Sequence, residues 1–174
     1  FAAFGGQDVE RILLDYTEDS EIRAFDHRTQ EKTLHTGLAG VRKFFEGLFA
    51  QLSDLSALAA PVVDVQESDR SQVFLVWSCA SSGVVSATDT FTFDEAGKIK
   101  NQNVAFTSAG EPAEGAPAPE NVSGDGVVQK AWDNHFAAFG GQDVERILLD
   151  YTEDSEIRAF DHRTQEKTLH TGLA

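Results

Sequence analysis

Asp89 is the residue best placed to do chemistry in this sequence, because it is an acidic side chain on the apolar face of a predicted strand. Alternation along Val84–Asp94 predicts one face made of Val85, Ala87, Asp89, Phe91 and Phe93. A carboxylate on such a face must be paired, hydrogen-bonded or protonated with a raised pKa. Two interpretations follow. Asp89 either serves a pocket, or it is a buried structural residue satisfied by a neighbouring Trp, Asn or backbone group.

Other polar and aromatic side chains are expected near Asp89 from their positions on neighbouring strands and helices. Asn101 and Asn103 share a predicted strand face with Ile99 and Ala105, so they would line the mouth of a cavity. The only cysteine, Cys79, shares a face with Trp77 and is expected to be an inert core thiol. The predicted pocket-lining residues are Trp77, Phe91, Asn101, Asn103, Phe45 and Trp132.

The sequence shows no pattern typical of a metal or phosphate site. Four histidines, His27, His35, His162 and His170, do not stand with carboxylates at metal-ligand spacing, and one cysteine excludes a cysteine-based metal site. We find no glycine-rich phosphate loop and no serine nucleophile motif. We therefore expect no metal and no cofactor.

Charge and hydropathy exclude several classes of partner. The formal net charge of −15 repels phosphate backbones and anionic lipid, so we expect neither nucleic-acid nor membrane-surface binding. No apolar run approaches the ~18 residues that a membrane span requires. The remaining partners are identical units of the same protein and a small apolar ligand.

The sequence contains a long internal repeat, because residues 1–39 recur unchanged as residues 136–174. The offset is 136 − 1 = 135 residues, the size of one ordinary domain. We predict a unit over residues 1–107 that lacks the start of its first helix, a Pro/Gly/acidic linker over 108–126, and the beginning of the next identical unit over 127–174. This organisation suggests a piece of a longer polypeptide. The sequon Asn121-Val122-Ser123 favours an extracellular location.

Periodicity and turn signals predict helices followed by long strands. The helices span about 128–139, with Asp125 as a cap, 142–151 with its copy 7–16, and 41–52. A short hairpin over 21–36 lies between the second and third helices, and four strands follow at about 55–66, 71–81, 84–94 and 98–107. This order predicts an α+β fold, in which a curved, mostly antiparallel sheet wraps around about three helices.

The strand-turn-strand sequence from Ala87 to Ile99, ATDTFTFDEAGKI, resembles the nuclear transport factor 2-like (NTF2-like) superfamily, including its SnoaL-like and ketosteroid isomerase-like branches. Glu18-Asp19-Ser20 before a strand and Gly37 before a helix match the same pattern. The resemblance covers the whole unit apart from the linker. It implies an NTF2-like cone, a fold that hosts enzymes, binders, transport factors and assembly domains.

The resemblance also implies roles for three residues. In the isomerase branch an aspartic acid at the position of Asp89 stays neutral and donates a hydrogen bond to a developing oxyanion. Asp26 lies near the position of the general base, and His135 lies near the position of a tyrosine donor. The alternatives are that Asp26 caps the turn before His27 and that His135 is a satisfied core histidine.

Three functions remain open at this point. The first is a structural or assembly module of a tandem-repeat polyprotein, which could form filaments by head-to-tail exchange. Its units could associate through an outer sheet face that carries Ser86, Thr88, Thr90 and Thr92, with Phe74 and Val76 nearby. The second is a small-molecule pocket, either a binder or an isomerase- or cyclase-like enzyme that uses Asp89. The third is that the duplication was engineered. In each case we expect residues 127–171 to pack on a core formed by residues 40–107.

Overall fold

The computed structural model describes residues 2–67, 71–111, 115 and 122–173. The chain divides into two compact units, Phe1–Pro119 (unit 1) and Glu120–Ala174 (unit 2). Parts of the predicted linker 108–126, including Asn121 of the sequon, lie outside the described residues. Within the described part of the chain, no helix is long and apolar enough to cross a membrane.

The described residues of unit 1 form three α-helices, one short 3-10 helix (η1) and six strands. In chain order these elements are α1 (Ala2–Gly5), α2 (Val9–Leu13), β1 (Tyr16–Asp26), β2 (Glu31–Thr36), α3 (Gly37–Gln51), β3 (Leu58–Gln66), β4 (Gln72–Cys79), η1 (Ala80–Ser82), β5 (Val84–Phe93) and β6 (Ile99–Ser108). The predicted hairpin, third helix and four strands all form. The first strand begins at Tyr16, five residues before the expected start at Glu21.

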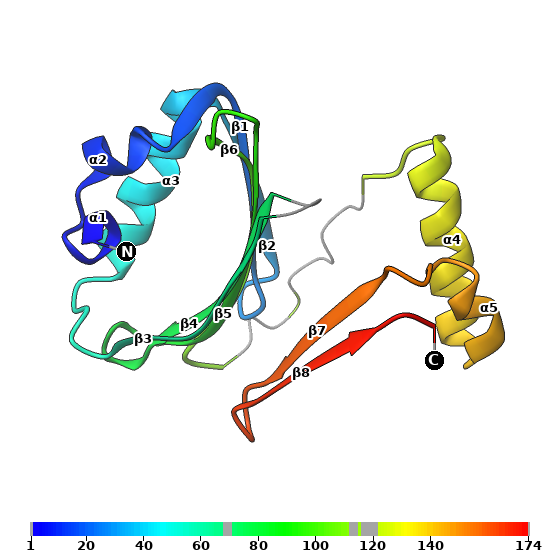
Figure 1. Ribbon diagram of the computed structural model, residues 1–174. Helices are drawn as coiled ribbons and strands as arrows, with labels where there is room; N and C mark the ends of the chain where they lie inside the picture. Colours follow the sequence, from blue (N-terminus) through cyan, green and yellow to red (C-terminus); the bar gives the residue numbers. More distant parts are fainter. Residues whose placement is uncertain (1, 68–70, 112–114, 116–121, 174) are drawn as a thin grey trace. The chain divides into compact units, whose positions relative to one another are not determined.

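The six strands of unit 1 form one curved sheet in the order β2-β1-β6-β5-β4-β3. Neighbouring strands run antiparallel except β1 and β6, which are parallel. The sheet curves around the side on which α1, α2 and α3 lie, and α3 contacts β1 and β2 (Figure 1). The predicted α+β class is confirmed, because helices pack against one face of a curved, mostly antiparallel sheet.

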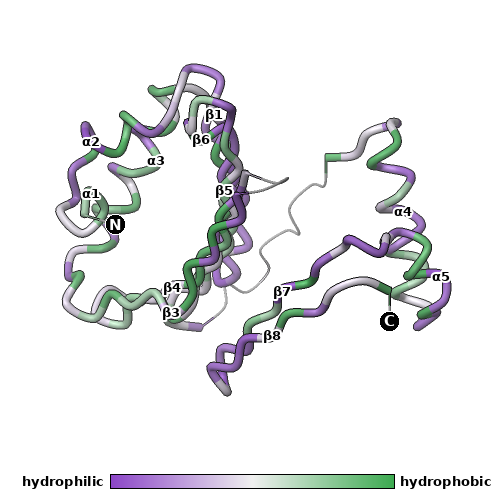
Figure 2. The backbone as a smooth tube through the Cα atoms, viewed as in Figure 1, coloured by the Kyte–Doolittle hydropathy of each residue, from purple (hydrophilic) through white to green (hydrophobic). Residues whose placement is uncertain are grey.

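The core of unit 1 lies between the helices and this sheet face. Hydrophobic and hydrophilic residues intermix along the strands, as expected for a sheet with two different faces (Figure 2). Ile22 from β1, Val41 and Phe45 from α3 and Val104 from β6 belong to one buried cluster.

Over residues 122–173, unit 2 forms two helices and one hairpin. Its elements are α4 (Val127–Gly140), α5 (Val144–Leu148), β7 (Glu156–Asp161) and β8 (Glu166–Thr171). The N-cap of α4 is Gly126, which makes no side-chain cap, so the predicted cap at Asp125 is wrong. The strands β7 and β8 form a separate two-stranded sheet. In the described residues of unit 2, this hairpin therefore has no further strand beside it.

Replacing either of two glycines of α3 with alanine should change the free energy of unfolding, but in opposite directions. Gly37 has a φ of +66°, and a Cβ there would lie 3.0 Å from Glu18 Oε2 and 3.2 Å from the Glu18 carbonyl oxygen. Gly37→Ala should therefore lower the free energy of unfolding by about 1–2 kcal/mol. Gly47 has open space around a built Cβ, so Gly47→Ala should raise it by about 0.5–1 kcal/mol. Urea unfolding of the 174-residue chain measures both, and a shift in the same direction would contradict the geometry.

Candidate functional site

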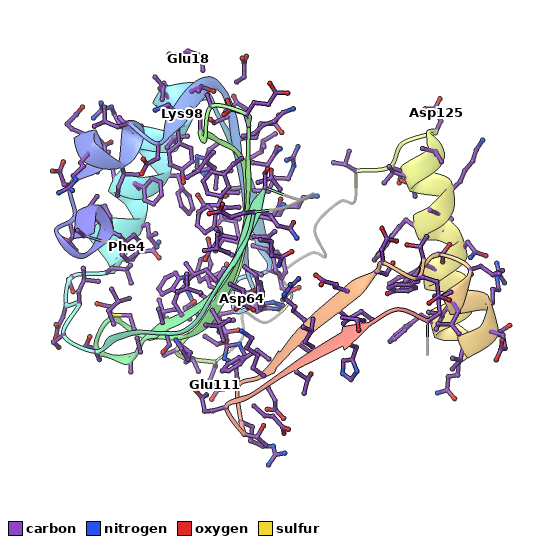
Figure 3. All side chains as sticks on the ribbon, viewed as in Figure 1. Phe4, Glu18, Asp64, Lys98, Glu111 and Asp125 are labelled. Carbon is purple, nitrogen blue, oxygen red and sulfur yellow. The ribbon has the colours of Figure 1, made fainter. Side chains whose placement is uncertain are left out.

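Unit 1 contains a cavity of about 400 Å³ between its helices and its sheet. Side chains of the helices and of the strands project toward one another across this space, and Phe4 is labelled at α1 on the helix side (Figure 3). The lining is mostly aromatic and aliphatic, and it includes Phe4, Phe44, Phe45, Phe91, Phe93 and Phe106. A cavity of this size and polarity is typical of small-molecule sites.

Asp89 is the carboxylate of this cavity that lies deepest in the protein. It lines the cavity although only 3% of its surface is exposed. Its Oδ2 accepts a hydrogen bond from Trp77 Nε1 at 2.6 Å, and its Oδ1 accepts one from Gln102 Nε2 at 2.7 Å. Burial raises the pKa of Asp89 to about 6, although the bonds from Gln102 and Trp77 act in the opposite direction.

Tyr16 extends the same hydrogen-bond network. Its hydroxyl donates to Gln102 Oε1 at 2.6 Å, so a continuous chain runs from Tyr16 through Gln102 and Asp89 to Trp77. All four side chains line the cavity. Burial, with the nearby carboxylates of Asp89 and Asp15, raises the pKa of Tyr16, so the phenol keeps its proton. The network thus joins one ionisable carboxyl group, Asp89, to a hydroxyl donor that stays protonated, Tyr16.

Neither Tyr16 nor Gln102 was among the predicted site residues, and for Gln102 a β-bulge is the reason. Thr92 pairs with Asn101, whereas the next residue, Phe93, pairs with Ile99, so Lys100 is an extra residue in β6. The bulge reverses the alternation, and Ile99 and Gln102 both face the core. The signal that could have revealed this is the alternating segment Gln102, Val104 and Phe106, all of which line the cavity.

The same bulge corrects the expected positions of Asn101 and Asn103. Neither belongs to the cavity lining, because each lies one residue away from the inward-facing Gln102. Asn101 Nδ2 instead donates to Thr92 Oγ1 at 3.3 Å, and Asn103 is exposed. A second bulge at the start of β5 turns Val85 outward, where 60% of its surface is exposed, and places Val84 in the core.

Trp77, Phe91 and Phe45 line the cavity with Asp89, as the sequence patterns predict. Asp26 does not. It accepts hydrogen bonds from the Arg28 amide at 2.8 Å and from Ser108 Oγ at 2.8 and 3.0 Å. Although partial burial would raise the pKa of Asp26, these bonds outweigh it and lower that pKa. Asp26 therefore holds the turn after β1.

His135 and Trp132 belong to unit 2. His135 Nδ1 lies 3.4 Å from Asp150 Oδ2, and the His135 ring stacks on Trp132 with centroids 6.1 Å apart. The ring also lies against Tyr151, with centroids 5.8 Å apart. These contacts of both side chains lie within unit 2, and their assignment to a catalytic or pocket-lining role remains a prediction.

Metal ligation has no candidate among the described residues, which contain no group of three His, Cys, Asp or Glu side chains able to hold an ion. Cys79 is buried, and its Sγ donates to the Asp54 carbonyl oxygen at 3.3 Å. The polar side chains that line the cavity can exchange a proton at Asp89 and form hydrogen bonds at Tyr16, Gln102 and Trp77.

Solved structures similar to this chain share low sequence identity with it. A steroid delta-isomerase from Pseudomonas aeruginosa is 17% identical, with 60% of this chain and 72% of that chain covered and a TM-score of 0.46. A SnoaL-like protein of unknown function from Burkholderia thailandensis is 16% identical, with coverages of 63% and 87% and a TM-score of 0.48. The epoxide hydrolase/cyclase-like enzyme SalBIII is 20% identical, with coverages of 60% and 82% and a TM-score of 0.43.

Among curated proteins, none matches this chain. The family model described as the SnoaL-like domain matches residues 1–102, which include every residue of the hydrogen-bond network around Asp89. The match covers more than half of the 174 residues. This chain therefore belongs to the SnoaL-like domain family.

Proposed function

We propose that unit 1 binds a small, largely apolar carbonyl compound and that Asp89 exchanges a proton with it, as an isomerase- or cyclase-like enzyme of the SnoaL-like family would. The observation that carries this proposal is the position of Asp89. It is a nearly fully buried carboxyl group, yet it borders an apolar cavity of about 400 Å³. A group that served only packing would gain nothing from facing an open space.

The protonation of Asp89 supports the role of a base. With a pKa of about 6, Asp89 is mostly ionised at pH 7, and both of its oxygens accept N–H donors. The neutral, donating aspartic acid that the family resemblance implies would need a pKa well above 7. A pKa near the working pH is also suited to proton transfer in both directions.

The neighbours of Asp89 support this chemistry by holding the carboxylate in one orientation. Trp77 and Gln102 each bind a different oxygen of Asp89, and Tyr16 fixes the amide of Gln102 through its Oε1. In the proposed reaction, Asp89 removes a proton from the carbon beside the carbonyl group, and the electron pair moves to form an enolate. The carboxylic acid then returns the proton to the same carbon or, where a β,γ double bond extends the enolate to a dienolate, to the γ-carbon.

The lining favours a neutral ligand over an anionic one. Its aromatic and aliphatic side chains offer apolar contact area, whereas its two carboxylates, Asp89 and Asp15, repel negative charge. The net charge of −15 acts in the same direction at longer range. A mono- or bicyclic ketone meets these conditions.

A second candidate function is a structural module of a tandem-repeat polyprotein, which could form filaments. The unchanged recurrence of residues 1–39 as 136–174 favours it, because selection for one catalytic site gives no reason to keep identical copies in series. The length of the native gene product tests this candidate. A product holding several identical units would support an array, and natural copies should differ at silent codon positions.

The raised pKa of Asp89 predicts a specific pH dependence of stability. In the folded state Asp89 keeps its proton up to about pH 6, whereas the ordinary pKa of an aspartic acid is 3.8. The stability that comes from this tighter proton binding is therefore fully present below pH 3.8 and is lost as the pH rises through 6. Asp89→Asn removes the titration. Between pH 4 and pH 6.5 the wild type should lose about 2–3 kcal/mol relative to this variant, measured by urea unfolding at each pH. Parallel pH profiles would contradict the raised pKa.

Replacing the carboxyl group of Asp89 with an apolar side chain should lower stability at neutral pH. In Asp89→Leu the donors Trp77 Nε1 and Gln102 Nε2 lose their partner, so the free energy of unfolding should fall by about 2–5 kcal/mol. Urea unfolding at pH 7 measures this change. A loss of well under 1 kcal/mol would show that Asp89 does not anchor the network and serves the pocket alone.

Proton exchange can be tested directly with a bicyclic ketone as the probe. In D₂O at pH 7, the 174-residue protein should accelerate hydrogen–deuterium exchange at the carbons beside the carbonyl group, followed by NMR. Asp89→Asn should lower the accelerated rate by about 100-fold or more, because general-base catalysis contributes factors of about 10²–10⁴. Asn103→Ala, on the exposed side of the same sheet, is the matched control and should keep the wild-type rate.

Two outcomes would overturn the proton-transfer proposal. Equal exchange rates in the wild type and in Asp89→Asn would exclude Asp89 as the base. If the wild type binds the ketone in a thermal-shift titration but the hydrogen–deuterium exchange rate stays at background, unit 1 binds the ketone without catalysing proton transfer.

A further inference from the structure

The cavity of unit 1 offers few hydrogen-bond donors to a ligand. Among the described side chains that line it, only Tyr16, Trp77 and Gln102 carry a permanent N–H or O–H group. All three side chains are buried, so bulk water does not serve them. The bonds that each donor already makes therefore decide which of them can bind a polar atom of a ligand.

Tyr16 and Trp77 each have a single hydrogen to donate, and the network uses both. The Tyr16 hydroxyl donates to Gln102 Oε1 at 2.6 Å, and Trp77 Nε1 donates to Asp89 Oδ2 at 2.6 Å. Either group could turn to a ligand only by leaving its partner, and a buried polar group that loses its partner is costly. Neither donor is therefore free for a ligand in this arrangement.

Gln102 differs from these two donors because its amide nitrogen carries two hydrogens. One hydrogen is used in the bond from Nε2 to Asp89 Oδ1 at 2.7 Å. Within the described part of the chain, no acceptor receives the second hydrogen. The Gln102 amide thus borders the cavity with one N–H group to spare.

Tyr16 and Asp89 together determine which way the Gln102 amide faces. The Tyr16 hydroxyl occupies Oε1, and the Asp89 carboxylate accepts from Nε2. If the amide were reversed, Oε1 would stand beside an Asp89 oxygen, and an ionised carboxylate repels another acceptor. The network therefore keeps the nitrogen, with both hydrogens, on the side of Asp89.

Strand pairing places this amide beside the proposed proton acceptor. In the β5–β6 pair, Phe91 lies opposite Gln102 and Asp89 lies opposite Val104, so Asp89 and Gln102 are diagonal neighbours on the cavity face. In a ketone, the carbonyl carbon that bears the oxygen is bonded directly to the α-carbon. A ketone whose α-carbon faces Asp89 therefore brings its oxygen close to Gln102 Nε2.

We propose that the second N–H group of Gln102 binds the carbonyl oxygen of the ligand and stabilises the negative charge that this oxygen gains in the enolate. This inference rests on the proposed function of unit 1. Asp89 takes the α-proton, the C–H electron pair forms the carbon–carbon double bond, and the carbonyl π pair moves onto the oxygen. The charge thus moves from one acceptor of the Gln102 amide to the other.

Tyr16 assists this role of Gln102 without touching the ligand. Its hydroxyl draws electron density toward Oε1, and hydrogen bonds that are linked in this way strengthen one another. Both N–H groups of the amide then donate more strongly. Gln102 is the catalytic residue of this proposal, and Tyr16 is a positioning residue.

Infrared spectroscopy of the bound bicyclic ketone tests the contact without depending on proton transfer. A hydrogen bond lowers the C=O stretching frequency, so the band of the ketone bound to the 174-residue wild type should lie below its position in an apolar solvent. Gln102→Met, which has no N–H group, should lose this shift. Trp77→Phe is the matched control and should keep it, because this variant also removes one donor from Asp89 but leaves the proposed contact.

The exchange rate gives a second measurement on the same variants. Gln102→Met should lower the rate of ketone hydrogen–deuterium exchange by about 100-fold or more, as the loss of one oxyanion donor does in other enzymes. A Gln102→Met protein that loses this rate but keeps the lowered C=O band would assign Gln102 to orienting Asp89 alone and would overturn the inference. So would a wild type that does not bind the ketone, or one in which the bound band stays at its position in an apolar solvent, whether or not the variant folds.

The inference and the proposed function fail separately in these experiments. If the lowered band depends on Gln102 while Asp89→Asn keeps the wild-type exchange rate, Gln102 binds the carbonyl oxygen and Asp89 is excluded as the base. If exchange depends on Asp89 while the band is not shifted, the proposed function stands and the role of Gln102 is excluded.

Discussion

The parallel pairing of β1 with β6 is the contact on which unit 1 depends. It joins the N-terminal hairpin to the four-stranded antiparallel meander, and it is the only parallel pair in the described sheet. It also sets the site, because it brings Tyr16 opposite Ile99 and Ile22 opposite Gln102. From there the Tyr16 hydroxyl reaches Gln102, and Gln102 reaches Asp89.

Local hydrogen bonds secure this pairing at the point where β1 changes register. Ser20 Oγ accepts from the Thr17 amide at 2.8 Å and donates to the Ile99 carbonyl oxygen at 2.6 Å. The Ile99 amide donates to the Asp15 carbonyl oxygen at 2.8 Å. In unit 2 the local bond is kept, from the Thr152 amide to Ser155 Oγ at 2.9 Å, but the strand begins only at Glu156. The first part of β1 is thus a strand because β6 lies beside it.

The site balances two opposing effects on one carboxyl group. Burial alone would drive Asp89 toward the neutral form, since removing a charge from water is costly. The donors Trp77 Nε1 and Gln102 Nε2 stabilise the charged form, and the pKa of Asp89 stays at about 6. Each pKa unit corresponds to about 1.4 kcal/mol. The remaining rise in the pKa of Asp89 from 3.8 to about 6 therefore lowers the stability of the fold at neutral pH by a few kcal/mol, and in return the cavity keeps a titratable group.

Local chemistry was determined by the sequence alone, as the two copies of the repeat show. Gln7 and Gln142 have φ of 53° and 54°, Gln30 and Gln165 have 59° and 58°, and the turns around them are therefore alike. The inward position of Asp89, the long strands and the helix over 41–52 also followed from periodicity, because alternation and helical spacing are properties of short segments. These signals were sufficient to predict the fold class and, with the family resemblance, the carboxyl group at the centre of the site.

Tertiary contacts decided the rest. The bulge at Lys100 turns Gln102 inward and Asn101 and Asn103 away, because a bulge depends on the register with a partner strand and leaves little trace in local periodicity. Burial depended on contacts in the same way: Ile22 and Ile157 have identical sequence surroundings for more than fifteen residues on either side, yet only Ile22 is covered. A segment's own sequence determines which face is apolar, but long-range partners determine whether that face leaves water.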